Sequence, residues 1–433
     1  MKTTKKLLFQ GADEAFVYTT QTKFHVEGDL QPHLILTSDE GLAREVIRIT
    51  KTMRELTKTK GQLFHWQPRV TRQRQPLHRP PQLAEDFLRI LCSSLWWVRK
   101  AFPNHHLHPL VELFEKHMEA RSFSGNFRPV CLEDVERLNA CVKAIRADAK
   151  TKAFHRRLDK HHELVGRNSF TLLTLIDRLF SHYSQLLVVG MDICYRRDPL
   201  NARLSLPITE TEAKAQCAQM IQYLRGDCKF NPLSYAWKLE FTEHTGWHTH
   251  LLLFFDPNLH QDDLVIAEHI GQHWNRVISG GNGCHFICNY EPSTCRGVGK
   301  IHHADVAKLW ALWELAAANL TSVDYYARMV LPKRRTFGCS QLPDAPAKKR
   351  GRPRALTSAR VADFVPPTLL SSANGKKQAS TKRRLSVKTK AIVQPISPPL
   401  FADLGAAWFK SSFSRQDGLG ADEGRSDETA WVV

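Results

Sequence analysis

The stretch from Lys238 to Asp256 constrains the fold more than any other part of the sequence. It reads KLEFTEHTGWHTHLLLFFD, and its first residues, Lys238 to Phe241, alternate polar and apolar as a half-buried strand does. Gly246 can take the positive φ that a tight turn needs. The residues from His248 to Phe255 then supply a return strand. This stretch therefore predicts a β-hairpin whose second strand enters an apolar core.

Three side chains of this hairpin have the chemistry of a divalent-metal site. Residues two apart on a strand point to the same face, so His248 and His250 project together. Glu240 joins them if it lies opposite His248, with Glu243 and Asp192 as other candidates for the carboxylate. Two imidazoles and a carboxylate suit Mn²⁺, and Mg²⁺ is also usable. His-x-His alone also fits an ordinary polar strand face, so the rest of the chain has to decide.

The charge of the chain points to its partner. The sequence has 433 residues, of which 42% are hydrophobic and 24% charged, as in soluble proteins. Its formal net charge of +18 and pI near 9.5 predict a polyanionic partner, most simply nucleic acid. No run approaches a transmembrane span, and the ten cysteines form no disulfide framework. We therefore expect a cytoplasmic protein with no membrane partner.

The composition divides the chain into three segments. Residues 1–165 are expected to be mostly helical, because Leu83–Phe102 and Leu132–Leu158 carry apolar residues at helical spacing. Residues 166–342 hold the hairpin and are expected to form a second domain that contains the candidate metal site. Residues 343–433 begin with a stretch rich in proline, serine and basic residues, which predicts a disordered basic tail.

The order of strands and helices in the middle segment predicts an α+β fold. Strands are expected at Leu186–Tyr195, Tyr235–Thr242, Trp247–Phe255 and His285–Tyr290, with helices over Thr209–Leu224 and Leu264–Val277. The sum is β-α-β-β-α-β, the ferredoxin-like arrangement, with an antiparallel sheet and the hairpin in its middle. Cys284 and Cys288 fall at the last strand and are interpreted as small core residues.

A long helix is expected after this sheet. Apolar residues spaced three and four apart from Val306 to Val323 predict it, and its pattern continues into Tyr325 and Tyr326. Helical phase keeps Tyr326 near the apolar stripe and turns Tyr325 outward, on the same side as Arg328. A helix break near Asn319–Ser322 would reset this phase and exchange the two tyrosines.

An exposed tyrosine near a metal site can act as a nucleophile on a phosphodiester. The metal polarises the phosphate, and the phenolate oxygen attacks phosphorus to give a covalent phosphotyrosine. Arg328 is placed to hold a phosphate oxygen or to stabilise the phenolate. Two ordinary tyrosines, one buried and one at the surface, would give the same local pattern.

The combination of motifs resembles a known family. A His-x-His strand inside β-α-β-β-α-β, followed by a helix with Tyr-x-x-Arg, resembles the HUH endonucleases, which include rolling-circle replication initiators, relaxases and single-strand transposases. The narrower resemblance rests on the segment that contains GWHTHLLLFFD, then YYAR and then RRTFGCS. The segment is similar in particular to the inovirus gene II-type replication proteins and to the prophage-borne YagK/YfjJ C-terminal domain family. The resemblance covers about residues 186–342 and implies that the sheet is an HUH palm.

The resemblance implies roles for single residues. His248, His250 and Glu240 become metal ligands, with Mg²⁺ or Mn²⁺ as cofactor. Tyr325 matches the tyrosine of the family's Tyr-x-x-Lys motif, Tyr326 lies beside it, and Arg328 stands in place of the lysine. Thr249 replaces the usual bulky hydrophobic residue between the histidines. A guanidinium binds phosphate but does not readily donate a proton, so Arg328 is not equivalent to that lysine.

The tail carries a further DNA-binding motif. The run KKRGRPR resembles an AT-hook, whose arginines insert into an A·T-rich minor groove, and it also fits a generic basic tail. Its basic residues are Lys348, Lys349, Arg350, Arg352 and Arg354.

Two functions follow as expectations. The first is a phage, prophage or plasmid replication initiator that nicks single-stranded DNA through a 5'-phosphotyrosine. Its partner would be single-stranded or supercoiled DNA at a replication origin, with host replication machinery as a further partner. The second is a DNA-binding protein without catalysis, acting as an origin binder or regulator that keeps the fold.

Overall fold

The computed structural model describes most of the chain up to Gln341. The described residues are 12–20, 22–24, 33–35, 38–65, 81–93, 95–120, 123, 129, 131–196, 208–243, 246–290, 297–313, 320–331 and 335–341. Contacts divide the chain into two compact units, Met1–Gly375 and Lys376–Val433, and every described residue belongs to the first. The expected basic tail and its AT-hook-like run, Lys348 to Arg354, lie outside the described residues.

The N-terminal region is mostly helical, as its apolar spacing predicts. Its helices are α2 (Ala12–Thr19), α3 (Ser38–Lys58), α4 (Gln82–Leu91), α5 (Leu95–Ala101), α6 (Pro109–Glu119) and α7 (Leu132–Ala149). The described residues of this region also form the short strands β1 (Thr22–Phe24), β2 (His33–Ile35) and β3 (His105–Leu107). The first two pair with each other, whereas β3 pairs with a strand from far along the chain.

A six-stranded antiparallel sheet forms the second half of the described structure. Its strands are β4 (Gln185–Tyr195), β5 (Ser234–Thr242), β6 (Gly246–Phe255), β7 (Gly283–Ile287), β8 (Gly299–His302) and β10 (Phe337–Cys339). They lie in the order β10-β5-β6-β4-β7, and β8 pairs with the other end of β4. With α9 (Glu210–Gln222) and α10 (Asp263–His273), the chain order is β-α-β-β-α-β. The α+β class and the antiparallel sheet are confirmed.

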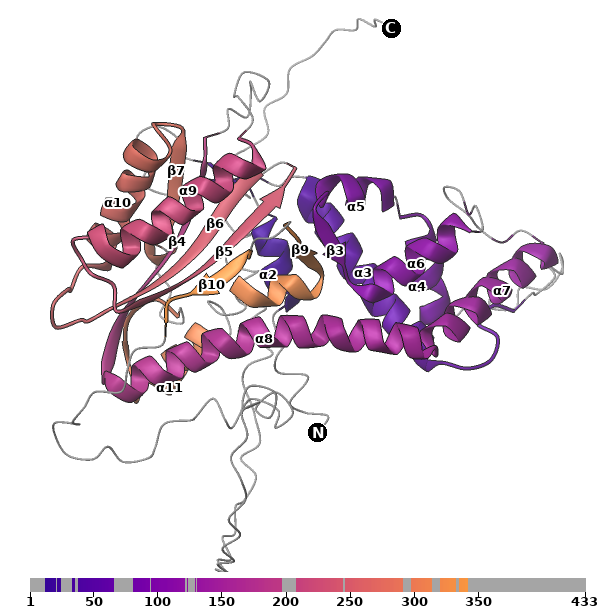
Figure 1. The fold of residues 1–433 in the computed structure, drawn as a ribbon. Helices are drawn as coiled ribbons and strands as arrows, with labels where there is room; N and C mark the ends of the chain where they lie inside the picture. Colours follow the sequence, from indigo (N-terminus) through magenta and orange to yellow (C-terminus); the bar gives the residue numbers. More distant parts are fainter. Residues whose placement is uncertain are drawn as a thin grey trace, which may run out of the picture. The chain divides into compact units, whose positions relative to one another are not determined.

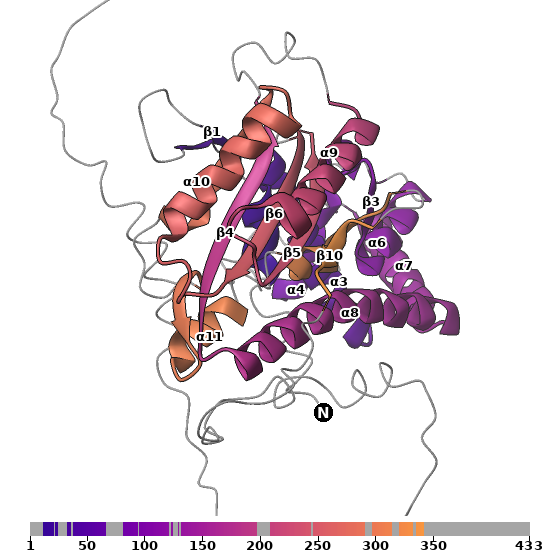
Figure 2. The same cartoon turned by 60° about the vertical axis from the view of Figure 1, so that its left-hand side comes forward.

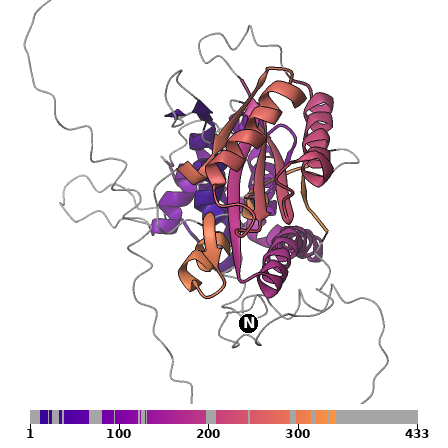
Figure 3. The ribbon, with the colours of Figure 1, turned by 90° about the vertical axis from the view of Figure 1, so that its left-hand side faces the viewer.

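Different helices pack on the two faces of the sheet. Successive residues of β6 point to opposite faces, so Leu251, Leu253 and Phe255 separate from Leu252 and Phe254. Apolar side chains of α9 and α10 pack on the first set, and Figures 2 and 3 show these helices together on one face. Side chains of α8 (Lys152–His182) and α11 (Val306–Ala311) pack on the second set.

One helix, α8, serves two cores. It runs without interruption through residue 165, where the sequence places a domain boundary (Figure 1). Phe154 and Val165 belong to the apolar cluster of the N-terminal helices. Leu172 and Leu179, further along α8, belong to the cluster under the sheet.

The helix expected from Val306 does not continue through Arg328, and that part of the prediction is wrong. Residues 306–311 form α11, residues 312 and 313 are π-helical and residues 320 and 321 are helical, whereas residues 314–319 are outside the described part. Ser322–Tyr325 forms a 3₁₀ turn, η5, and Ala327–Met329 forms the strand β9, which pairs with β3. Backbone hydrogen bonds to a strand more than two hundred residues away override the local helical spacing. The phase argument that separated the two tyrosines therefore does not apply.

The last predicted strand is also shorter than expected. The strand β7 ends at Ile287, and Cys288–Tyr290 forms a 3₁₀ turn, η3. Among the described residues, no helix combines the length and the apolar character needed to cross a membrane.

Candidate metal centre

The hairpin of β5 and β6 brings the three expected ligands together. Its register places Glu240 opposite His248 and Lys238 opposite His250. Gly246, the first residue of β6, has a φ of 72°. Glycine adopts this value without strain, whereas a residue with a side chain adopts it only at a cost in free energy. Because opposite residues of an antiparallel pair share a face, the carboxylate and both imidazoles project from the same side.

These three side chains form what we call the metal group: Glu240, His248 and His250. The Oε2 atom of Glu240 lies 3.6 Å from Nε2 of His248 and 3.5 Å from Nε2 of His250. All three residues are buried, and neither Nε2 has a hydrogen-bond partner among the described residues. Buried polar atoms are normally satisfied, so convergent unpaired nitrogens beside a carboxylate suit a cation. The group could hold a metal ion.

Two acceptors fix the imidazoles in the orientation that a metal needs. The Nδ1 of His248 donates to the carbonyl oxygen of Gly246 at 3.0 Å, and Nδ1 of His250 donates to Asp192 at 2.5 Å. With Nδ1 occupied as a donor, each neutral ring turns an Nε2 lone pair inward. Asp192 on β4 thus orients a ligand, as carboxylates beside metal-binding histidines commonly do. Glu243, the other candidate, is exposed at the end of β5 and lies outside the metal group.

The charges around the metal group favour an ionised carboxylate. Burial acts to raise the pKa of Glu240, but the two imidazoles beside it and the charge of Lys238 bring that pKa well below its usual range. Burial acts to lower the pKa of His250, whereas Asp192 and Glu240 raise it to about 10. A cation is therefore favoured at the position between these groups, and a metal ion would replace a proton there.

A buried ion pair connects the sheet to the tyrosine segment. Lys238 lies beside His250 across the hairpin and forms an ion pair with Asp324 of η5. Both side chains are almost completely buried, at 0% and 1% exposure. Asn168 of α8 also donates to Asp324, at 3.2 Å. Breaking a buried pair leaves an uncompensated charge, so any displacement of η5 from the metal-bearing face costs the free energy of this pair.

The N-terminal region also reaches the metal group. His105, on β3, has a buried Nδ1 atom without a hydrogen-bond partner among the described residues. Burial lowers the pKa of His105 to about 3, with Glu240 acting to raise it and Lys238 to lower it further. This imidazole is therefore neutral and lies within electrostatic reach of the metal group. No local motif marks His105, because its position depends on the pairing of β3 with β9.

Both tyrosines are buried, which corrects the expectation that Tyr325 is exposed. Tyr325 is 6% exposed and Tyr326 is 2% exposed, and both pack in the N-terminal apolar cluster. The hydroxyl of Tyr325 accepts a hydrogen bond from Arg54 of α3, and that of Tyr326 donates to Asp13 of α2. Burial raises the pKa of Tyr325, although the nearby Arg54 guanidinium lowers it in part.

Histidines complete the surroundings of Tyr325, and we call them, with Arg54 and Tyr325 itself, the tyrosine cluster. Its histidines are His108, His161 and His162. The ring centroid of Tyr325 lies 4.9 Å from that of His108, and His162 stacks on it at 5.9 Å. His161 donates from Nε2 to the backbone oxygen of Tyr325 at 2.9 Å. The cluster comes from α3, the N-cap of α6, α8 and η5, and apart from Tyr325 the sequence gives no signal for its members.

Arg328 is not the cation beside Tyr325. It lies on β9 opposite His106 of β3, and its buried Nε has no hydrogen-bond partner among the described residues. Arg54, which is 271 residues from Tyr325 in the chain, takes the position that helical spacing assigned to Arg328. Arg328 remains near the buried Asp324. Burial raises the pKa of Asp324, whereas the charges of Lys238 and Arg328 act to lower it.

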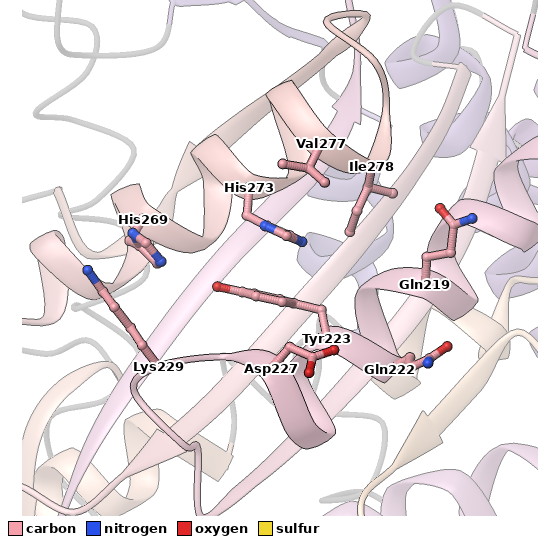
Figure 4. A pocket seen from close by; sticks show the side chains of 9 residues that line it. All are labelled: Gln219, Gln222, Tyr223, Asp227, Lys229, His269, His273, Val277 and Ile278. Carbon is pink, nitrogen blue, oxygen red and sulfur yellow. The ribbon is translucent and has the colours of Figure 1, made fainter.

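A separate cavity lies on the opposite face of the sheet. It has a volume of about 530 Å³. It is lined by Lys229 and by residues of α9, α10 and the π-helical turns that end them, η1 (Tyr223–Asp227) and η2 (Trp274–Ile278). Figure 4 shows Tyr223 parallel to His273, and their ring centroids are 3.7 Å apart. The metal group and the tyrosine cluster do not contribute to its lining.

Comparisons with known proteins give one similarity. No curated protein and no solved structure matches the chain. Residues 147–340 match the family model of the YagK/YfjJ C-terminal domain. The matched segment contains the metal group, Tyr325 and Arg328, but it excludes Arg54, His105 and His108. The match supports assigning this segment of the chain to the YagK/YfjJ C-terminal domain family.

Proposed function

We propose that this chain is a metal-dependent DNA nickase of the HUH type that starts replication of a phage, prophage or plasmid. The metal group carries the proposal, because two imidazoles with unpaired Nε2 atoms converge on one ionised carboxylate. The strand order β5-β6-β4-β7, with the ligands on the central hairpin, is consistent with an HUH palm. The net charge of +18 suits a DNA partner.

His248, His250 and Glu240 would hold Mn²⁺ or Mg²⁺, as mixed nitrogen and oxygen ligands allow. When bound, such an ion polarises the scissile phosphate of single-stranded DNA. Asp192 and the Gly246 carbonyl keep both imidazoles oriented. Lys238 places a positive charge beside the ligands. Its ion pair with Asp324 stabilises that charge in the buried interior.

Tyr325 is the proposed nucleophile. Its hydroxyl oxygen attacks phosphorus, loses its proton, and forms a 5'-phosphotyrosine, while the bond to the 3'-oxygen breaks and that oxygen takes up a proton. Arg54 donates to the same hydroxyl and would stabilise the phenolate that develops there. Because Tyr325 is buried in the N-terminal cluster, the proposal requires η5 and β9 to shift when DNA enters.

A second candidate function is DNA binding without catalysis, with the protein acting as an origin binder or regulator. The observation that favours it is the burial of both tyrosine hydroxyls in hydrogen bonds to Arg54 and Asp13. A nucleophile engaged in this way cannot reach a phosphate unless the segment moves.

One experiment separates the two candidates. The full chain is incubated with a labelled random pool of single-stranded DNA and Mn²⁺, and denaturing electrophoresis detects protein that carries DNA covalently. The nickase predicts an adduct that chelator prevents, with the nucleotide attached to Tyr325 in the mass spectrum of the peptide. DNA binding without any adduct would support the second candidate instead.

A further inference from the structure

Two cysteines lie in the same cross-strand row as the metal group. Cys194 of β4 is directly opposite His248 of β6 on one side and Cys284 of β7 on the other. His248 is in turn opposite Glu240 of β5. Opposite residues of antiparallel strands share a face, so both thiols project from the face that carries the metal group. The row therefore runs from thiol to thiol to imidazole to carboxylate.

The two sulfur atoms are close enough to react with each other. The Sγ atoms of Cys194 and Cys284 are 2.9 Å apart, and the Cys194 sulfur also lies 3.5 Å from the Cys284 carbonyl oxygen. A disulfide requires a separation of about 2.05 Å and accepts the spacing of directly paired strands. Closing the bond thus needs a further approach of only about 1 Å. The expectation that Cys284 is simply a small core residue misses this neighbour.

The two thiols differ in their access to solvent. Cys194 is 7% exposed on the central strand β4, whereas Cys284 is partly exposed on β7. The strand β7 ends the order β10-β5-β6-β4-β7, so on its outer side Cys284 has no further strand among those described. A small reagent would therefore meet Cys284 first, and Cys194 would follow from within the sheet.

We propose that Cys194 and Cys284 form a reversible intrachain disulfide that weakens metal binding at the neighbouring metal group. The oxidant is a low-molecular-weight disulfide such as oxidised glutathione. The Cys284 thiolate attacks it, releases one glutathione thiol and forms a mixed disulfide. The Cys194 thiolate then attacks the Cys284 sulfur and releases the second glutathione. Two electrons pass to the glutathione disulfide, and the two cysteine protons leave with the two glutathione thiols.

The link to the metal runs through β4. Closing the bond pulls the Cys194 side chain toward β7 and away from His248, its partner on the other side. Asp192, two residues earlier on the same strand, orients His250. Disturbing groups that orient metal ligands lowers metal affinity by about 10- to 100-fold, and we expect the lower end of this range for a side-chain shift. The inference does not require that the protein nick DNA.

The test compares reduced and oxidised full-length protein. After incubation with oxidised glutathione, peptide mass mapping is expected to find a Cys194–Cys284 disulfide, which dithiothreitol removes. Calorimetric titration with Mn²⁺ is expected to show about tenfold weaker binding in the oxidised form. Absence of this disulfide under conditions that oxidise Cys92, or equal Mn²⁺ affinity in both forms, would overturn the proposal. Reduced protein that binds no Mn²⁺ would overturn the link to the metal group as well.

Variants separate the disulfide from general oxidation. Cys284→Ala changes only the more exposed thiol, and its Mn²⁺ affinity is expected to stay the same with or without oxidant. Cys92→Ser, at an exposed cysteine of the N-terminal region, is the matched control and is expected to keep the full oxidative response. If oxidation still weakens Mn²⁺ binding in Cys284→Ala, the Cys194–Cys284 disulfide is not the cause and the proposal is wrong.

Discussion

The metal group and the tyrosine cluster both contain buried histidines, yet their unpaired nitrogens have opposite character. In the metal group, the Nδ1 atoms face acceptors, so they donate, and each ring in its neutral form offers a lone pair on Nε2. In the tyrosine cluster, Nδ1 of His108 accepts from the backbone N–H of Leu110 at 3.1 Å. Its unpaired Nε2 therefore carries the hydrogen. One arrangement can receive a cation, and the other can only donate to a ring or an oxygen.

The two sites also differ in how far apart their residues lie in the sequence. The metal group occupies a single hairpin from Glu240 to His250. The tyrosine cluster needs Arg54, His108 and Tyr325, which three separate parts of the chain supply. A buried histidine alone therefore says little about chemistry; the partner of its second nitrogen decides whether it can bind a metal.

The strongest way to break this comparison is to remove a ligand. His248→Ala or His250→Ala is expected to abolish Mn²⁺ binding and, with it, any metal-dependent DNA cleavage. His65→Ala changes an exposed histidine and serves as the control. Calorimetry with Mn²⁺ measures the effect, and circular dichroism checks the fold. Undiminished Mn²⁺ affinity in the double variant would remove the metal assignment.

The next test concerns the hydroxyl of Tyr325. Tyr325→Phe keeps the buried ring and removes the attacking oxygen, so the covalent DNA adduct is expected to disappear while Mn²⁺ binding remains. Tyr326→Phe is the matched control, with adduct formation retained and a loss of about 1 kcal/mol in unfolding free energy for one hydrogen bond. An adduct on Tyr326 in the mass spectrum would reverse the assignment of the nucleophile.

Asp192 offers a graded test of the metal group. Asp192→Asn keeps the shape of the side chain but removes the charge beside His250, and Mn²⁺ affinity is expected to fall about tenfold. Asp159→Asn, on the exposed side of α8, provides a control of equal charge change. If Asp192→Asn binds Mn²⁺ as tightly as the unmodified chain does, the orienting role is wrong.

Arg54 tests whether the tyrosine cluster serves more than stability. Arg54→Gln removes the charged donor to Tyr325, and chemical denaturation is expected to show a loss of about 1.5–3 kcal/mol. In the nickase, the rate of adduct formation is expected to fall at saturating DNA while DNA affinity is unchanged. Arg44→Gln, on the same helix but bonded to Glu40, is the control. A stability loss without any change in this rate would limit Arg54 to a structural role.

The smallest effect on either site is expected from the basic tail. Deleting residues 348–390 removes thirteen lysines and arginines and one acidic residue, Asp363, all outside the described residues. For each DNA phosphate that the shortened chain no longer neutralises, the slope of log affinity against log salt is expected to fall by about 0.7 to 0.9. Adduct formation on a short, saturating oligonucleotide is expected to remain. An unchanged salt slope would show that the tail does not touch DNA.

The sequence predicts the features that depend on interactions between residues close together in the chain, and it misses those that depend on residues far apart. The hairpin, its register and the β-α-β-β-α-β order depend on alternation and helical spacing within short windows, and the structure contains them. For the segment around Tyr325, local spacing predicts a helix because the apolar pattern continues into it and no residue there signals a helix end. Pairing with β3 and the Lys238–Asp324 ion pair decide its conformation, and both join residues far apart in sequence.

The roles of Asp192 and Cys284 are also beyond local patterns. Asp192 is one of several carboxylates available for the metal, and only the β4–β6 register shows that it faces the second nitrogen of His250. Cys284 has the pattern of a core residue, and only the β4–β7 register pairs it with Cys194. Cross-strand neighbours are set by register, and register across strands that are not adjacent in sequence cannot be read from spacing alone.

The helix α8 has a consequence for how the protein unfolds. Its 31 residues, at about 1.5 Å each, form a rod of roughly 46 Å whose two halves are buried in different apolar clusters. Unfolding of either cluster would remove the packing around one half of α8 and would expose the apolar side chains of that half to water. The N-terminal helices and the sheet are therefore expected to melt together, as one calorimetric transition, and a chain shortened to begin at residue 166 is expected to lose cooperativity.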